Sequence, residues 1–375
     1  MLRVPAIITT VILLTISPVL ATGLTADLSA ALKGTKAAAV GVLVMRDGKV
    51  ADIAVKGRRR NDRPDPVQPG DLWRIGSDGK PITATLIARL VDRGVLNWKT
   101  PLKQMLPQFA ATMRPDYRGV TLVQLLSHQS GLPHDVSDMK LIDTLSKSAM
   151  PVPAQRLAII ARALQDKPVA PPGTKFSYSN TGFLIAAAIA ERATGMSYED
   201  LMLREIFAPL GMTSARITDP TGPEPLGHIK GKPVVNTADV FPLLYSPAGD
   251  WYLTLGDWAK FCLDQMAGVH GHGRLLKQAT YRMMQSLQIK DENGGVGLGW
   301  GIYPSIMGYA GPFLEHTGSD ETWYASVALR PATESGVLAV SNAGETMGGE
   351  KAANRALKAA LREIAPLVTA QPIPH

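Results

Sequence analysis

LWRIGSDGKPITATLIARLVDRG, residues 72–94, is the stretch of this sequence that says most about its fold. Its beginning, 72–76, is rich in apolar residues, and Pro81 is typical of the first turn of a helix. The apolar residues that follow share one helical face: Ile82, Leu86, Leu90 and Val91. Gly94 is a typical helix stop. We therefore expect a helix that begins at about Pro81 and is closed by Gly94.

Ser77 and Lys80 stand three residues apart at the entrance of this helix. Residues at that spacing share a helix face, so the serine hydroxyl and the lysine amine come within hydrogen-bonding reach. A serine needs a base to act as a nucleophile, and a lysine serves once its pKa is lowered by burial or by a neighbouring cation. The helix N-terminus adds free N–H groups and a positive dipole. Ser77 is therefore a candidate nucleophile and Lys80 its candidate base.

The same spacing recurs at Ser137 and Lys140. A serine followed at three by a lysine is expected about once by chance in a chain of ordinary composition. Ser77 follows an apolar run and opens a strong helix, whereas Ser137 lies in a looser stretch. The context therefore favours Ser77.

Candidate strands occur near both ends of the chain. Residues 40–45 and 50–55 are rich in β-forming side chains, and the Asp-Gly pair between them is a hairpin signal. β-character returns in three late segments: 299–303, 323–329 and 336–340. One sheet built from both termini, over about 38–75 and 296–365, accounts for this arrangement.

The middle of the chain, about 100–290, reads mostly as helices and loops. Its clearest helical segments are 123–126, 157–164, 184–193 and 258–266. A last helix is expected over 351–364, packed on the surface. We expect one domain, 22–375, with a groove where the sheet meets the helical region, and functional sites tend to lie in such grooves.

Two further segments carry polar groups suited to catalysis. Tyr178 and Asn180 precede the helix expected from 184; the tyrosine could act as a phenolate or a proton shuttle, and the amide could bind a substrate carbonyl and the lysine. His316 to Ser319 precede the strand expected from 323; Gly318 would admit a substrate backbone, and the Ser319 N–H could form an oxyanion hole with that of Ser77. Taken alone, the first segment also fits a polar turn and the second a glycine-closed loop.

Together the motifs resemble those of the penicillin-binding-protein-like serine hydrolases, a family that is related to class C β-lactamases and includes family VIII esterases and D-aminopeptidases. The motifs occur in the family's order: Ser77-x-x-Lys80, then Tyr178-x-Asn180, then His316-Thr317-Gly318. Three more segments are similar to recurrent sequences of the family: LLSHQSGL at 125–132, SPAG at 246–249 and GLGW at 297–300. The resemblance spans about residues 38–362.

The resemblance implies an α+β fold of the β-lactamase/transpeptidase type, with an antiparallel sheet flanked by helices and a mainly helical region. It also implies acyl transfer, in which Ser77 attacks a carbonyl, Lys80 and Tyr178 move protons, and Tyr178 activates the water that releases the acyl group. Neither a metal nor a cofactor is needed. The residues implied for substrate binding are Asn180, His316, Thr317, Gly318 and Ser319.

One departure from the family pattern bears on the substrate. β-Lactamases of this type carry a lysine where this chain has His316, and a histidine is mostly neutral at neutral pH. The change weakens the case for substrates with a carboxylate and favours an ester or a D-amino-acid amide. Asp78 is also unusual between the serine and the lysine, and a helix is expected to direct it away from the site.

Two other functions stay open. One is a β-lactamase or D-alanyl-D-alanine carboxypeptidase. The other is an inactive relative that binds peptidoglycan or a protein partner, although such a module has no need of the full set of proton-transfer groups.

The resemblance implies a small-molecule or peptide substrate. The composition is ordinary for a folded protein: 45% of the 375 residues are hydrophobic and 19% are charged. The formal net charge of +7 is dispersed, with its densest cluster at 58–60, so we expect no nucleic-acid partner. The single cysteine, Cys262, excludes an intrachain disulfide and fits a buried position. His270 and His272 lie in a glycine-rich loop without a third ligand nearby in sequence, which argues against a metal site.

Residues 1–21 read as a signal peptide, with a positive charge at Arg3, an apolar run over 6–20 and a small residue at Ala21. A retained membrane anchor is the alternative, but the run is short and interrupted by proline. We expect cleavage near Ala21 and a periplasmic or secreted protein with no membrane span after cleavage. The sequence leaves the oligomeric state open.

Overall fold

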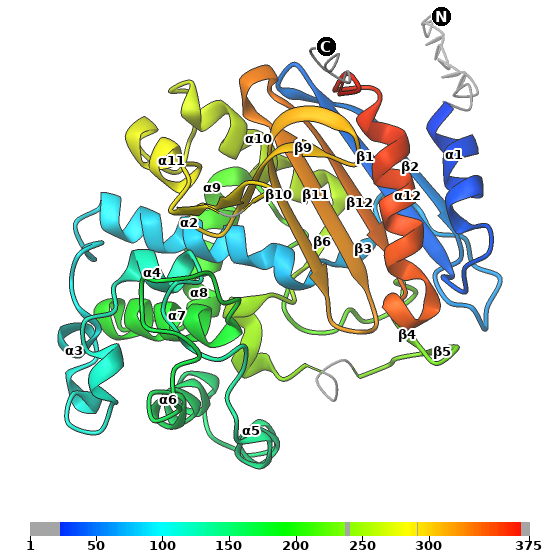
Figure 1. Ribbon diagram of the computed structural model, residues 1–375. Coiled ribbons are helices and arrows are strands. Elements are labelled where there is room, and N and C mark those ends of the chain that lie inside the picture. Colours follow the sequence, from blue (N-terminus) through cyan, green and yellow to red (C-terminus); the bar gives the residue numbers. More distant parts are fainter. Residues whose placement is uncertain (1–22, 237–240, 291, 369–375) are drawn as a thin grey trace, which may run out of the picture.

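The computed structural model describes residues 23–236, 241–290 and 292–368, and its main feature is an eight-stranded antiparallel sheet (Figure 1). The strand order is β2-β1-β12-β11-β10-β9-β8-β7. Its strands are β1 (Ala39–Arg46), β2 (Lys49–Gly57), β7 (Ile289–Lys290), β8 (Gly295–Val296), β9 (Gly301–Ile306), β10 (Tyr309–Ser319), β11 (Tyr324–Arg330) and β12 (Ser335–Ser341). Strand β1 pairs with β12 along its length, so the expected sheet from both ends of the chain is confirmed.

The β1–β2 hairpin forms where the Asp-Gly pair predicted it. Asp47 and Gly48 both have positive φ, at 50° and 71°, as the favoured two-residue hairpin turn requires. Strand β1 is buried on both faces, which explains its continuous apolar run. Val40, Val42 and Val44 belong to one buried cluster, and alternate residues such as Leu43 belong to another.

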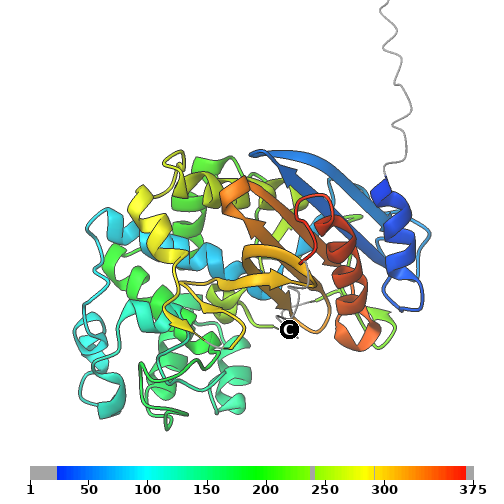
Figure 2. The same ribbon diagram turned by 45° about the horizontal axis from the view of Figure 1, so that its top comes forward.

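Helices cover both faces of the sheet. On the outer face, α1 (Gly23–Leu32) and α12 (Gly349–Leu361) lie side by side (Figures 1 and 2). The buried residues of α12 are mostly alanine and leucine, which lets the helix approach the strands closely: Ala352, Ala353, Ala356, Leu357, Ala360 and Leu361. On the inner face, α10 (Leu255–Val269) contacts strands β1, β2, β11 and β12, and Cys262 is buried in it as expected.

The helical region is organised around α7 (Asn180–Thr194), which is buried over residues 180–191 and contacts α2 (Gly79–Asp92), α4 and α6. A helix that is apolar on all sides belongs in the core. The other helices of the helical region are α3 (Leu102–Met105), α4 (Leu122–Leu126), α5 (Met139–Ser146), α6 (Val152–Ala163), α8 (Tyr198–Met202), α9 (Ala208–Leu210) and α11 (Gln278–Met284). Helix α2 runs from this region to the end of β10, and so places its first turn at the junction (Figure 1).

Two segments differ from expectation. The apolar run before Ser77 forms a short strand, β3 (Leu72–Arg74), which pairs with β6 (Tyr252–Thr254) outside the main sheet. The motif at 316–319 lies at the end of the long strand β10, so the alternative of a glycine-closed loop is wrong. Gly311 and Pro312 weaken the β pattern of the sequence, so this strand was not predicted. The structure accommodates them with a register shift between Ala310 and Phe313.

Within the described residues, no helix is both long and apolar enough to cross a membrane. The expected signal peptide, 1–21, lies outside those residues.

Candidate active site

Ser77 lies in a tight turn that joins β3 to α2. Residues Gly76–Asp78 form a single 3₁₀ turn, η1, before the α-helix begins at Gly79. Lys80 lies in the first turn of α2, three residues after Ser77 and on the same face, so the two side chains meet with 2.9 Å between Lys80 Nζ and Ser77 Oγ. Gly76 adopts a φ of +51°, which favours glycine at this position.

Lys80 is completely buried beside Ser77. Its Nζ also donates to the Ala248 carbonyl at 2.6 Å and lies 4.8 Å from the centre of the Tyr178 ring. Burial lowers the pKa of Lys80 to about 7, although nearby carboxylates, Asp250 first and then Asp135 and Asp78, oppose the shift. A substantial fraction of Lys80 is therefore a neutral amine near neutral pH, able to accept a proton from Ser77.

Tyr178 approaches the nucleophile from the helical region. Its hydroxyl is hydrogen-bonded with Ser77, and burial raises its pKa. The raised pKa disfavours the phenolate that the sequence left possible and suits a protonated tyrosine that relays a proton. The ring stacks on His128 with 4.5 Å between ring centres.

His128 holds the segment that carries Tyr178. Its Nδ1 accepts a hydrogen bond from the Ser179 N–H at 3.0 Å, and burial keeps its pKa well below the usual value. The neutral ring therefore fixes the backbone between Tyr178 and Asn180 and also lines the site.

Asn180 is engaged by a residue that the sequence did not single out. Its Nδ2 donates to Asp135 Oδ1 at 2.9 Å, and its Oδ1 has no hydrogen-bond partner among the described residues. Asp135 is held in turn by His134, with 2.5 Å between Nδ1 and Oδ2. No spacing rule connects Asp135 with Asn180, because the contact joins a loop to the start of a helix.

The third segment brings the end of β10 against the nucleophile turn. A β-carbon on Gly318 would lie 1.9 Å from the Ile75 carbonyl oxygen and 2.8 Å from the Ser77 nitrogen. Glycine at 318 is thus required by the protein's own backbone, a reason that the sequence did not reveal. A β-carbon on Gly76 would lie 2.7 Å from the Ser319 nitrogen, so the end of β10 also packs closely against the turn that carries Ser77.

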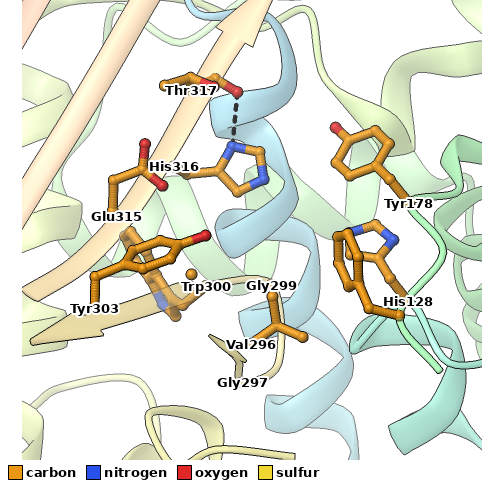
Figure 3. Close-up of a pocket in the computed structure, with 12 residues that line it drawn as sticks. His128, Tyr178, Val296, Gly297, Gly299, Trp300, Tyr303, Glu315, His316 and Thr317 are labelled. Carbon is orange, nitrogen blue, oxygen red and sulfur yellow. Dashed lines mark hydrogen bonds between the residues drawn. The ribbon is translucent and has the colours of Figure 1, made fainter. Parts of the chain in front are cut away.

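His316 projects from β10 into the site with a defined tautomer (Figure 3). Its Nδ1 donates to the Thr317 carbonyl at 2.8 Å, which leaves Nε2 directed toward the cavity. Burial, followed by the charge of Lys80, lowers the pKa of His316 to about 4. The ring is therefore neutral at physiological pH. The hydroxyl of Thr317 contacts Tyr324, so this residue faces the site with its backbone.

Asp78 points into the protein, and the expectation that a helix would direct it elsewhere is wrong. The residue belongs to the 3₁₀ turn rather than to the α-helix, and only 1% of it is exposed. Its Oδ1 lies 3.4 Å from His316 Nδ1, and neither carboxylate oxygen has a hydrogen-bond partner among the described residues. Burial raises its pKa well above the usual value, which favours the neutral acid.

A cavity of about 190 Å³ opens in front of these groups (Figure 3). His128, Phe176 and Tyr178 form the wall on the helical side, and the sheet side carries Trp300, Tyr303, Glu315 and His316. None of the described residues that line it is a lysine or an arginine.

The second Ser-x-x-Lys segment does not form a comparable pair. Ser137 Oγ donates to Asp166 Oδ1 at 2.7 Å and accepts from Arg162, with no hydrogen bond to Lys140 among the described residues. In the part of the chain that the structure describes, no group of three or more His, Cys, Asp or Glu side chains is placed to hold a metal.

The geometry can be compared with known proteins. The protein-family model Beta-lactamase matches residues 24–362, nearly the whole described chain. The chain belongs to the beta-lactamase family. The resemblance to penicillin-binding-protein-like serine hydrolases is thereby confirmed, and so is the β-lactamase/transpeptidase-like fold.

Individual relatives resemble this chain in sequence or in fold. Penicillin-binding protein 4 of Amycolatopsis lactamdurans is 30% identical over 290 residues, which cover 73% of this chain and 72% of that protein. Penicillin-binding protein 4* of Bacillus subtilis is 31% identical over 170 residues, 44% of this chain but only 34% of that protein. The octameric penicillin-binding protein homologue from Pyrococcus abyssi superposes with a TM-score of 0.74 at 25% identity, covering 90% of this chain and 77% of the other. SurE has the same fold, with a TM-score of 0.72 at 23% identity over 94% of this chain and 78% of SurE.

Proposed function

We propose that this protein is a serine hydrolase that forms an acyl-enzyme at Ser77 and hydrolyses an ester or a D-amino-acid amide. The observation that carries the proposal is the three-part contact at the nucleophile: Lys80 Nζ at 2.9 Å from Ser77 Oγ, and the Tyr178 hydroxyl in a hydrogen bond with the same serine. A site of this kind has a base and a second proton carrier on one oxygen.

In the first step, neutral Lys80 takes the proton of Ser77 as Oγ attacks the carbonyl carbon. The negative charge that develops on the carbonyl oxygen is stabilised by the backbone N–H groups of Ser77 and Ser319, which belong to two backbone segments in close contact. Tyr178 donates a proton to the leaving group as the carbon–oxygen or carbon–nitrogen bond breaks, and regains one from Lys80. Water then attacks the acyl-enzyme while its proton passes through Tyr178 to Lys80, and Lys80 gives that proton to Ser77 Oγ as the bond between the acyl carbon and Oγ breaks.

The electrostatics of the cavity favour an ester or amide substrate that places no carboxylate near His316 and Lys80. A substrate carboxylate needs a cationic partner, and His316 is neutral while Lys80 is occupied by Ser77 and Ala248. The names of the penicillin-binding relatives favour the second candidate, a β-lactamase or D-alanyl-D-alanine carboxypeptidase. The cavity is less suited to the substrates of such enzymes, because it has no cationic partner for their carboxylate.

The test uses the purified chain, Ser77→Ala and Ser137→Ala. Each is assayed with a short-chain nitrophenyl ester, a D-alanyl anilide and a chromogenic cephalosporin, and is labelled with a fluorophosphonate probe. We expect labelling and ester or anilide turnover in the first protein and in Ser137→Ala, and neither in Ser77→Ala. Fast cephalosporin turnover would instead support the second candidate, and a chain that neither turns over any substrate nor reacts with the probe would refute the hydrolase.

Export is part of the same proposal and rests on the sequence pattern of residues 1–21. Expression of the full chain in a Gram-negative host should yield a periplasmic protein shortened near Ala21. Retention of the intact N-terminus would contradict it.

A further inference from the structure

Glu315 is an acidic side chain on the cavity wall that the mechanism does not use. It precedes His316 on β10 and pairs with Gly301 of β9 at the point where β9 begins. Its carboxylate has no hydrogen bond or ion pair with the described residues, although it is mostly buried, and burial raises its pKa to about 7. Buried carboxylates are usually paired, so an unpaired one in a ligand cavity calls for a partner.

The surroundings supply no such partner. The titratable groups that act on the pKa of Glu315 are His316, which is neutral, and Asp78, which carries no positive charge in either form. Lys80 is buried at the nucleophile, where it donates to Ser77 and Ala248. A cation that pairs with Glu315 would therefore come from outside the described residues.

The cavity walls suit a cation that is partly stripped of water. Figure 3 shows Glu315 and Tyr303 on the sheet wall and Tyr178 with His128 opposite. Four aromatic side chains line the cavity: Phe176, Tyr178, Trp300 and Tyr303. His128 and Lys80 lie against the Tyr178 ring and Trp300 is almost fully buried, so Phe176 and Tyr303 offer the more accessible aromatic surface. Aromatic faces attract ammonium groups, and more strongly when solvent is excluded.

We propose that this cavity binds a positively charged group of the substrate, such as an ammonium, with Glu315 as the residue that determines the preference. The preferred substrates are then esters or amides that carry a cation close to the scissile carbonyl. The inference rests on the proposed hydrolase activity for its kinetic test, and a binding measurement examines it separately.

The kinetic test compares matched pairs of substrates that differ only in charge. One pair carries the charge on the acyl side: the nitrophenyl ester of trimethylammoniobutyric acid and its isostere with a tert-butyl group in place of trimethylammonium. The other carries it on the leaving side: acetylthiocholine and its tert-butyl isostere. We expect kcat/KM to favour the cationic member of at least one pair by about tenfold or more, the size of a charge-assisted contact.

Glu315→Gln removes the charge and keeps the shape, so the ratio of kcat/KM between the cationic and the neutral member of each pair should fall to near one. Glu321→Gln is the matched control, because Glu321 is exposed in the turn after β10 and does not line the cavity. Equal rates within both pairs, or a preference that survives in Glu315→Gln, would overturn the proposal.

Calorimetric titration with phenyltrimethylammonium separates this inference from the hydrolase itself. Binding by the unmodified protein and by Glu321→Gln, but not by Glu315→Gln, would support the cation site even if no ester were hydrolysed. Ester turnover without cation preference or binding would leave the hydrolase standing and refute the cation site.

Discussion

Replacing Gly318 with alanine tests how closely catalysis depends on the contact between β10 and the nucleophile turn. The added β-carbon would stand 1.9 Å from the Ile75 carbonyl oxygen and 2.9 Å from the Asp78 nitrogen. Carbon and oxygen approach no closer than about 3.3 Å even in the short contacts of sheets, so the two backbones must separate by about 1.4 Å. A misplacement of about 1 Å in a catalytic group costs roughly 100-fold in rate. We therefore expect kcat/KM for a nitrophenyl ester to fall by about that factor or more.

The assay measures ester hydrolysis, the rate of fluorophosphonate labelling of Ser77, and Tm. Labelling should slow together with hydrolysis, because the nucleophile itself is displaced. Gly70→Ala is the control, since a β-carbon there meets no atom within 4 Å and its φ is ordinary. If Gly318→Ala kept activity within a few-fold of the unmodified protein, the contact would not set the geometry of the site, and the reasoning would fail.

Three further outcomes follow from the same site. The kcat/KM of a neutral ester should rise with pH near about 7, as Lys80 loses its proton. Asp135→Asn should move this rise to lower pH, because it removes a carboxylate that raises the pKa of Lys80. An unchanged profile would exclude Lys80 as the titrating base. Asp78→Asn should raise Tm at pH 8 but hardly at pH 4: the folded-state pKa of Asp78 is raised, so the native protein loses stability as pH climbs above the ordinary value of 3.8. A Tm gain of equal size at both pH values would refute the buried-charge explanation. His128→Phe keeps a ring beside Tyr178 but leaves the Ser179 N–H without its acceptor, which should cost about 1–3 kcal/mol in chemical unfolding and slow the ester reaction; full stability would contradict this role.

The parts of the fold that the sequence predicted well depend on local signals. The Asp-Gly turn at 47–48 and the helix after Pro81 each follow from the conformational preferences of a few neighbouring residues. The grouping of Ser77 with Lys80 is also local, and both the α-helix and the observed 3₁₀ turn place them together.

The parts that were missed depend on contacts between distant segments. Strand β10 carries glycine and proline that weaken its β pattern, and only pairing with β9 and β11 stabilises it. Asp135 reaches Asn180 across 45 residues, and the inward direction of Asp78 follows from a turn type that no nearby residue announces. The role of Gly318 is visible only when the backbone at Ile75 is in place.

The pairing of β1 with β12 has a consequence for how the protein matures. Val40 pairs with Ser341 and Met45 with Gly336, so the sheet joins segments about 300 residues apart. Contacts of such sequence separation form late and make folding slow. Ser77 and Lys80 emerge from the ribosome long before β10 to β12 can supply the opposite wall of the cavity. Assembly of the candidate site therefore requires the late strands, and a molecule that lacks them keeps Ser77 and Lys80 without that wall.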